Sequence, residues 1–273
     1  MATTEVAPPT GKRPPRRRLK RIERAAVVGV MTREVINFRS FWRSATFSST
    51  VEPTVYLLAF GLGLGAVLDK VDGFDYIDFV STGVVATAVL FSSAFSAMFG
   101  TFVKREFQRT YDAILAAPVD VEELVTAETL WLALRAGVFG CAPLLVGVFF
   151  GLDPSITVVL VPLIAFLTGF GFAALGVLLA ATVKSIDSFS YVTSGLLTPM
   201  LLVAGTFFPI SQLPEWARVL SQFNPLHHCV ELVRAATFGT FEASDLLRVG
   251  ALVLFAAVCW TLAVRRTKAR VVQ

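Results

Sequence analysis

The sequence predicts an all-α polytopic membrane protein with six transmembrane helices. The chain is 55% hydrophobic and only 16% charged, and its mean hydropathy is +0.70. Charged residues are confined to short segments between long apolar runs, as in membrane proteins. A helix needs about 20 apolar residues to cross a bilayer. The six predicted spans are residues 45–68, 79–103, 130–152, 156–183, 190–206 and 246–264.

Two segments precede the first span. Residues 1–18 form a basic, proline-rich tail, which is more typical of a contact with anionic lipid than of nucleic-acid binding. Residues 19–43 are predicted to form an amphipathic helix, because apolar residues recur at intervals of three and four. These are Val27, Met31, Val35, Phe38 and Trp42. The helix either lies in the membrane interface or packs on protein as an ordinary cytoplasmic helix.

The distribution of Lys and Arg predicts the orientation. Most of the 24 Lys and Arg residues precede residue 45, follow residue 264, or lie in 104–109. With six spans these segments share one side of the membrane. The positive-inside rule therefore predicts that both termini are cytoplasmic.

The segment 104–124 is a charged insert between the second and third spans. A short helix is predicted, because apolar residues recur at helical spacing at Phe107, Tyr111, Ile114 and Leu115. Pro118 ends this helix. Asp120 can cap a following helix with Glu123 at its third position, as in a capping box. The result is a short helix that either transmits a push from a soluble partner or serves as a plain connection.

Two ionisable residues are predicted at membrane depth, where a charge needs a partner. Glu52 in the first span and Arg135 in the third lie at similar depth from the same side, so they can pair. The pair either stabilises the bundle or lines an entry path.

Residues 205–240 are too polar and proline-rich for one span. Pro209, Pro214 and Pro225 divide this segment into short pieces on the outer side. Backbone that leaves regular helix at membrane depth must be buried in protein or line a wet cavity. The segment is therefore either a gate or an ordinary outer loop lying on the bilayer.

Motifs for catalysis and cofactor binding are absent from the sequence. No G-x-x-x-x-G-K-[ST] phosphate loop occurs, so the chain is not expected to hydrolyse ATP by itself, and no cofactor is expected. The adjacent His227 and His228 point apart on a helix and have no Cys or carboxylate cluster beside them. We therefore predict neither catalytic residues nor a metal site.

Several strings, in order and at suitable spacing from about residue 25 to 265, carry a family resemblance. They are "EPTVYLLAFGLGLGAVL", "TYDAILAAPV", "AETLW" and "TPMLLVAGTFFPISQLPEWARVLSQFNPLHH". The chain resembles the membrane permeases of type-2 ABC exporters. Among them it is most similar to nodulation-factor (lipo-chitooligosaccharide) export permeases, with daunorubicin-type drug-export permeases close behind.

The resemblance implies a transmembrane domain over residues 19–265, followed by a cytoplasmic tail, 266–273. Such a permease lies in a bacterial inner membrane, pairs with an identical or related permease, and works with a separate ATPase subunit that binds ATP. The amphipathic substrate would be a lipid-linked or lipidated saccharide, or a hydrophobic drug. The rival functions are an ion-coupled secondary transporter and a membrane scaffold that transports nothing.

The resemblance also implies roles for individual residues. Segment 104–124 would carry the coupling helix, with ATPase contacts at Glu106, Arg109, Tyr111 and Asp112. The region before the last span would form two short re-entrant helices at an outer gate, with gate residues Pro209, Pro214, Asn224 and Pro225.

Overall fold

The computed structural model describes residues 22–65, 70–71 and 73–271, and the side chain of Glu52 lies outside the described part. The predicted tail 1–18 also lies outside it. Nearly all described residues are helical. The elements in order are α1 Arg24–Gly65, β1 Lys70–Val71, β2 Phe74–Asp75, α2 Tyr76–Leu90, η1 Phe91–Phe95, α3 Ser96–Phe102, η2 Val103–Phe107, α4 Thr110–Leu115, α5 Val121–Phe139, α6 Ala142–Phe149, η3 Ile156–Leu160, α7 Val161–Thr182, α8 Ser188–Val192, η4 Thr193–Leu197, α9 Thr198–Leu202, η5 Ile210–Gln212, α10 Glu215–Gln222, α11 Pro225–Phe238 and α12 Ala243–Val271.

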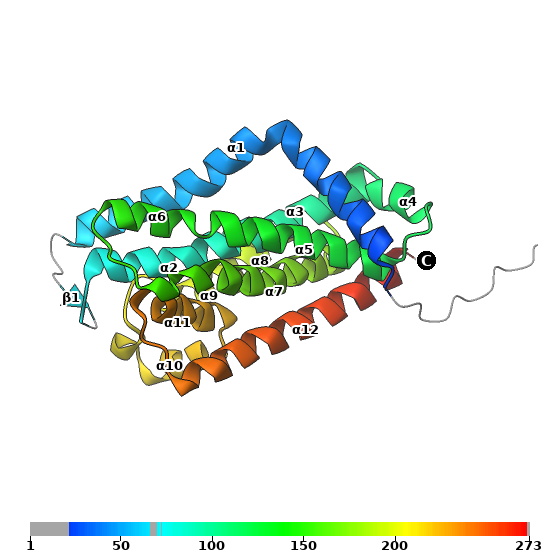
Figure 1. The fold of residues 1–273 in the computed structure, drawn as a ribbon. Coiled ribbons are helices and arrows are strands. Elements are labelled where there is room, and N and C mark those ends of the chain that lie inside the picture. Colours follow the sequence, from blue (N-terminus) through cyan, green and yellow to red (C-terminus); the bar gives the residue numbers. More distant parts are fainter. Residues whose placement is uncertain (1–21, 66–69, 72, 272–273) are drawn as a thin grey trace, which may run out of the picture.

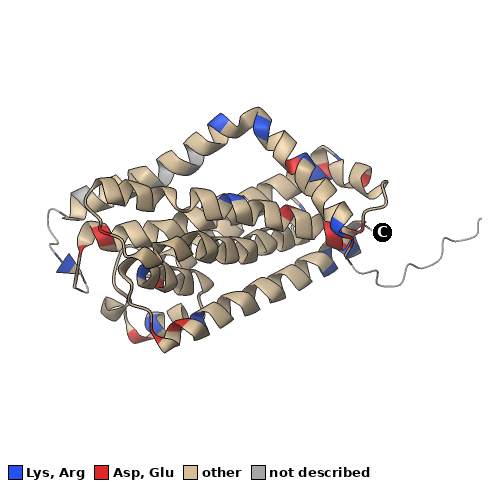
Figure 2. Cartoon of the chain, viewed as in Figure 1, with Lys and Arg blue, Asp and Glu red and all other residues tan. Residues whose placement is uncertain are grey.

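The long helices lie side by side in one bundle (Figure 1). Helix α7 is central, because it packs on both α5 and α12. The start of α1, the short helix α4 and the end of α12 share one end of the bundle, which we call the inner end (Figure 1). The β1–β2 hairpin and α10 lie at the opposite, outer end. Charged residues gather at the two ends and leave the middle of the bundle mostly apolar (Figure 2).

Four helices in the described part are long and apolar enough to cross a membrane. They are Tyr76–Phe107, Val121–Phe149, Ile156–Thr182 and Ala243–Val271. They overlap the predicted second, third, fourth and sixth spans. The other two predicted spans correspond to shorter helical stretches, Thr54–Gly65 and 188–202. The chain is therefore a helical membrane protein, and the count of six spans stays a prediction.

Helix α1 combines the predicted amphipathic helix and the predicted first span. It bends at Phe41, whose backbone leaves helical geometry (φ −130°, ψ 18°), and the bend separates two arms (Figure 1). In the first arm Val30 is buried and packs with Tyr111 and Leu124. This arm thus packs on protein along one face, while Trp42 and other apolar residues stay exposed.

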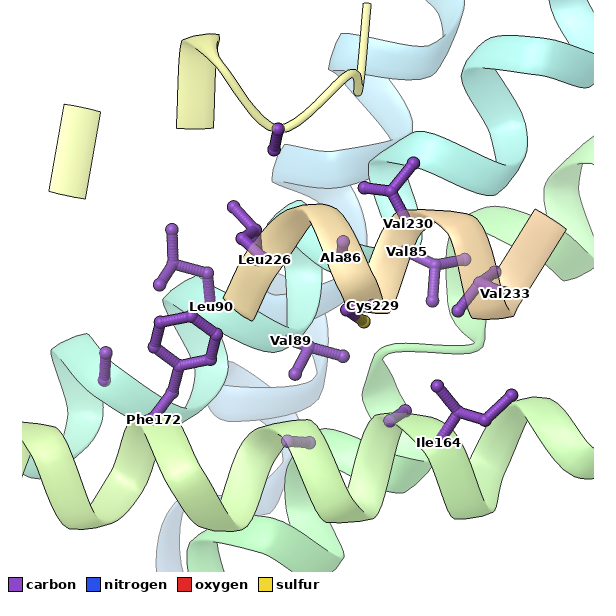
Figure 3. Packing of buried hydrophobic residues seen from close by; sticks show 14 of the residues in the cluster. Val85, Ala86, Val89, Leu90, Ile164, Phe172, Leu226, Cys229, Val230 and Val233 are labelled. Carbon is purple, nitrogen blue, oxygen red and sulfur yellow. The ribbon is translucent and has the colours of Figure 1, made fainter. Parts of the chain in front are cut away.

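Helix α11 is inserted into the bundle. Its buried face packs against α2 and α7, as the close view shows (Figure 3). The contributing residues are Leu226, Cys229, Val230 and Val233 from α11, with Val85, Ala86, Val89 and Leu90 from α2 and Ile164 and Phe172 from α7. Because this helix is enclosed by protein, the segment after Pro225 is more than a loop lying on the surface.

Candidate functional site

The short helix α4 projects from the inner end between two long helices. The chain reverses at Arg109, which adopts a left-handed conformation (φ 49°), and α4 ends before Pro118. Helix α5 then begins with the predicted capping box, in which the backbone N–H of Asp120 donates to Glu123 Oε2 at 2.9 Å. The turn and the cap predicted for this insert are present, but the predicted helix is divided at Arg109, so Phe107 belongs to η2 and only Thr110–Leu115 form α4.

The predicted contact residues of this insert lie on different faces. Glu106, Arg109 and Asp112 are exposed at the inner end, next to the exposed ring of Phe107. Arg105 Nε donates to Glu106 Oε1 at 2.9 Å. Tyr111, in contrast, is only 1% exposed and lies inside the bundle. Three of these residues are thus on the surface, while Tyr111 anchors the helix from beneath.

Tyr111 belongs to a buried polar network. Its hydroxyl donates to Glu128 Oε2 on α5. Lys104 Nζ, in the π-helical turn η2, donates to Glu128 Oε1 at 3.0 Å and to Glu34 Oε1 on α1 at 2.8 Å. We call Tyr111, Glu128, Lys104 and Glu34 the inner network. It joins four elements of the inner end: α1, η2, α4 and α5.

The inner network is compact and largely buried. The side chains of Glu34 and Glu128 are only 6% and 3% exposed, and Lys104 is 19% exposed. Arg33 adds a second cation, since its Nη1 lies 2.8 Å from Glu34 Oε1. Burial and the neighbouring carboxylate of Glu128 raise the pKa of Tyr111, so its phenol stays protonated and donates. Removing one member leaves a buried charge uncompensated, which is costly, so the four elements are expected to move together.

Arg135 lies further along α5. Its guanidinium sits 5.2 Å from the ring centroid of Phe38 on α1. The predicted partner is Glu52, whose side chain lies outside the described part of the structure. The proposed pair of Glu52 and Arg135 therefore stays a prediction.

The three prolines divide the outer segment, residues 205–240, into short helical pieces as predicted. Pro209 precedes the turn η5, Pro214 precedes α10, and Pro225 is the first residue of α11. Asn224 caps α11, because its Oδ1 accepts from the backbone N–H of Leu226 at 3.0 Å. Its Nδ2 also donates to the carbonyl of Met200 at 2.7 Å. Asn224 thus joins the start of α11 to α9, and its role at a gate stays a prediction.

The chain between α9 and η5 is held against α2 and α11. A Cβ added to Gly83 on α2 would lie 2.3 Å from the carbonyl oxygen of Thr206, so only glycine permits this approach. Tyr76 on α2 donates to the carbonyl of Phe207 at 3.2 Å. From α11, Arg234 Nη2 donates to the carbonyl of Gly205 at 3.3 Å. The outer end is thus closed by backbone packing and carbonyl contacts.

The inner network was not predicted from the sequence. A usable signal was present, because Glu34 lies three residues after Met31 and four before Phe38, within the apolar stripe of the predicted helix. Glu128 likewise follows Val121, Leu124 and Val125 at helical spacing. A carboxylate inside an apolar stripe indicates a buried, paired charge.

The comparison with known protein families covers α4, α5, α11 and most of α1. Residues 26–238 match the family described as "ABC-2 type transporter". The chain belongs to the ABC-2 family. This ABC-2 protein is 35% identical to nodulation protein J of Sinorhizobium fredii over 229 residues, covering 82% of this chain and 87% of the relative.

Two further relatives support the same assignment. Nodulation protein J of Rhizobium meliloti is 31% identical over 85% of this chain and 88% of its own length. The inner membrane transport permease YadH of Escherichia coli is 25% identical over 87% of this chain and 94% of its own length. The resemblance recognised from the sequence strings is confirmed, and the ABC-2 protein is an ABC transporter permease.

Proposed function

We propose that this permease is the membrane part of an ATP-driven exporter, and that its segment 104–124 docks on a separate ATPase subunit. The observation that carries the proposal is the position of α4. It projects at the inner end, and the exposed charges are Glu106 in η2, Arg109 just before α4 and Asp112 in α4. From beneath, Tyr111 ties it to α5, and through Glu128 and Lys104 to the rest of the inner network.

The proposed topology has six spans. The second arm of α1 would be the first span and the stretch 188–202 the fifth, in addition to the four long helices. Both termini would be cytoplasmic at the inner membrane of a bacterium, because Lys and Arg concentrate in the two terminal segments and in 104–109, which the six spans place on one side. The shared position of α4, the start of α1 and the end of α12 supports this arrangement (Figure 1).

The proposed mechanism follows from the inner network. A push on α4 would act on Tyr111 and therefore on α5 through Glu128. Lys104 would carry the same displacement to the end of the Tyr76–Phe107 helix and to α1. In a pair of permeases this motion would open a path for an amphipathic substrate, a lipid-linked or lipidated saccharide or a hydrophobic drug. The outer segment 205–240 would be the gate at the far end of that path.

Co-purification with the candidate ATPase tests the docking surface. The test variant carries Glu106→Lys and Arg109→Glu. The control variant carries Glu215→Lys and Arg218→Glu, which reverse two exposed charges at the same three-residue spacing on α10 at the outer end. We expect the native chain and the control to retain the ATPase and the test variant to lose it. Equal retention by the test variant would show that Glu106 and Arg109 are not docking contacts.

Transport measurements test the energy source. Uptake into inverted vesicles should require a hydrolysable nucleotide and should stop when the ATPase partner cannot hydrolyse ATP. Uptake driven by an ion gradient would instead identify a secondary transporter. No uptake of any amphipathic substrate, despite a bound ATPase, would favour a scaffold.

A further inference from the structure

A cavity of about 380 Å³ lies beside the inner network. Its walls come from the first arm of α1, the stretch 96–108 and α5. Asn37 and Phe41 line it from α1, Lys104 from η2, and Trp131 and Arg135 from α5. Phe41 is also the residue at which α1 bends, so the bend shapes one wall.

Arg135 is the unusual group in this cavity. Among the side chains that the structure describes, none accepts a hydrogen bond from it, and its buried Nε has no acceptor. The ring of Phe38 lies 5.2 Å from its guanidinium, and the carboxylate of Glu34 attracts it without accepting a hydrogen bond from it. A cation at membrane depth ordinarily has an anionic or carbonyl partner, because removing it from water is costly. Among the described side chains Arg135 therefore keeps donors that an anion can use, and binding of an anion there is the alternative to the predicted pair with Glu52.

The two carboxylates that also line the cavity do not meet this need. Glu34 and Glu128 both accept hydrogen bonds from Lys104. Glu34 accepts a further one from Arg33, and Glu128 one from Tyr111. Among the charged residues that line the cavity, Lys104 and Arg135 balance the two carboxylates. Both carboxylates are hydrogen-bonded to Lys104, so the donors of Arg135 stay available to an incoming anion.

We propose that this cavity, the Arg135 cavity, binds the phosphate or sulfate headgroup of an anionic amphiphile. A guanidinium presents parallel N–H donors that match the oxygens of a phosphate or sulfate group. Asn37 supplies a neutral donor, and the rings of Phe41 and Trp131 contact the apolar stem. Trp131 suits the boundary between headgroup and chain because its indole ring is apolar with a polar N–H edge. A volume of about 380 Å³ accommodates a small headgroup.

This inference deepens the proposed function, since the headgroup would belong to the exporter's cargo on its way into the bundle. The binding itself requires no ATPase. A failure of headgroup binding is thus distinguishable from a failure of ATPase docking, because the two are measured on separate samples.

Calorimetric titration of the purified full-length chain in a neutral detergent tests the inference. The probe is dihexanoyl phosphatidic acid, and the comparison ligands are dihexanoyl phosphatidylcholine and inorganic phosphate. We expect the native chain to bind phosphatidic acid and Arg135→Gln to weaken that binding at least about tenfold. Arg135→Lys keeps the charge without the paired donors, so its affinity for phosphatidic acid should lie between that of the native chain and that of Arg135→Gln. Arg218→Gln, at an exposed arginine of the outer end, should bind like the native chain.

Three results would overturn the inference. They are unchanged binding by Arg135→Gln, equal binding of phosphatidylcholine, and inorganic phosphate binding as tightly as phosphatidic acid, which would assign the site to free phosphate instead of an amphiphile. If Arg135→Gln does not elute as a folded species, Asn37→Ala takes its place. Asn37 is exposed on α1, so its truncation leaves the fold intact and should still weaken binding several-fold.

Discussion

The two ends of the bundle are held together in different ways. At the inner end, ion pairs join residues far apart in the sequence, such as Lys104 with Glu34, and the carboxylates are nearly fully buried. At the outer end the ion pairs are more local and more exposed. Arg248 pairs with Asp245, three residues earlier, and with Glu231. The side chains of Arg248 and Glu231 are 29% and 26% exposed.

This difference indicates which interactions matter at each end. Buried ion pairs are costly to break, whereas exposed pairs contribute about 0–1 kcal/mol. The outer end depends instead on close backbone packing, as at Gly83 and Thr206. We therefore expect the inner end to be sensitive to the removal of charge and the outer end to added volume.

The largest effect is expected from Glu128→Gln. This change leaves Lys104 with one carboxylate fewer and Tyr111 without its ionised acceptor. It should lower the free energy of unfolding by about 3 kcal/mol, measured by denaturant titration in detergent. Glu122→Gln, on the first turn of the same helix, is the control. A loss below about 1 kcal/mol would mean that the inner network is not a strong link.

The next effect is expected at the outer end. Gly83→Ala places a Cβ against the carbonyl of Thr206 and should cost about 2 kcal/mol, since one element must shift. Gly250→Ala on α12, where a Cβ meets nothing, should be neutral or slightly stabilising. Thermal unfolding of both variants measures the difference. Equal melting temperatures would contradict close packing at this position.

A smaller effect is expected from Tyr111→Phe. The ring stays packed, but the hydrogen bond to Glu128 is lost, so about 1.5 kcal/mol of stability should disappear. Tyr191→Phe, at an exposed tyrosine, is the matched control. Tyr111→Phe should also reduce the stimulation of ATPase activity by the permease, because α4 loses its hydrogen bond to α5. Full ATPase stimulation in Tyr111→Phe would show that this hydrogen bond does not transmit motion.

The smallest effect is expected from Arg248→Gln. Arg248 and Glu231 are partly exposed, and glutamine at position 248 can still donate to the buried carboxylate of Asp245. The loss should therefore stay below about 1 kcal/mol and shrink as salt is added. A double-mutant cycle with Glu231→Gln isolates the pair. A coupling above about 2 kcal/mol at high salt would place the outer ion pairs in the same class as the inner ones.

Features with a local cause were predictable from the sequence. Pro118, Pro209, Pro214 and Pro225 end or begin helices because proline cannot donate a backbone hydrogen bond. Asp120 and Glu123 form a capping box through contacts three residues apart. The apolar runs likewise predicted the long helices, although Ala243–Val271 extends beyond the predicted span.

Features that depend on which helices meet were not predictable. Tyr111 was predicted as an ATPase contact because the insert resembles a coupling helix, yet α4 turns that side chain onto Glu128. The direction in which α4 faces follows from the left-handed turn at Arg109, and an arginine does not by itself predict such a turn. The Arg135 cavity likewise depends on the bend at Phe41, which sets α1 at an angle to α5.

By itself the sequence determined that this chain is a helical membrane permease with a charged insert at one end and a proline-divided segment at the other. The length of an apolar run and the effect of proline depend on residues close together in the chain, so both can be predicted from the sequence. Only the tertiary structure decided that Glu34, Lys104, Tyr111 and Glu128 share one buried site. Ion pairs between distant helices depend on packing geometry, which no local pattern specifies.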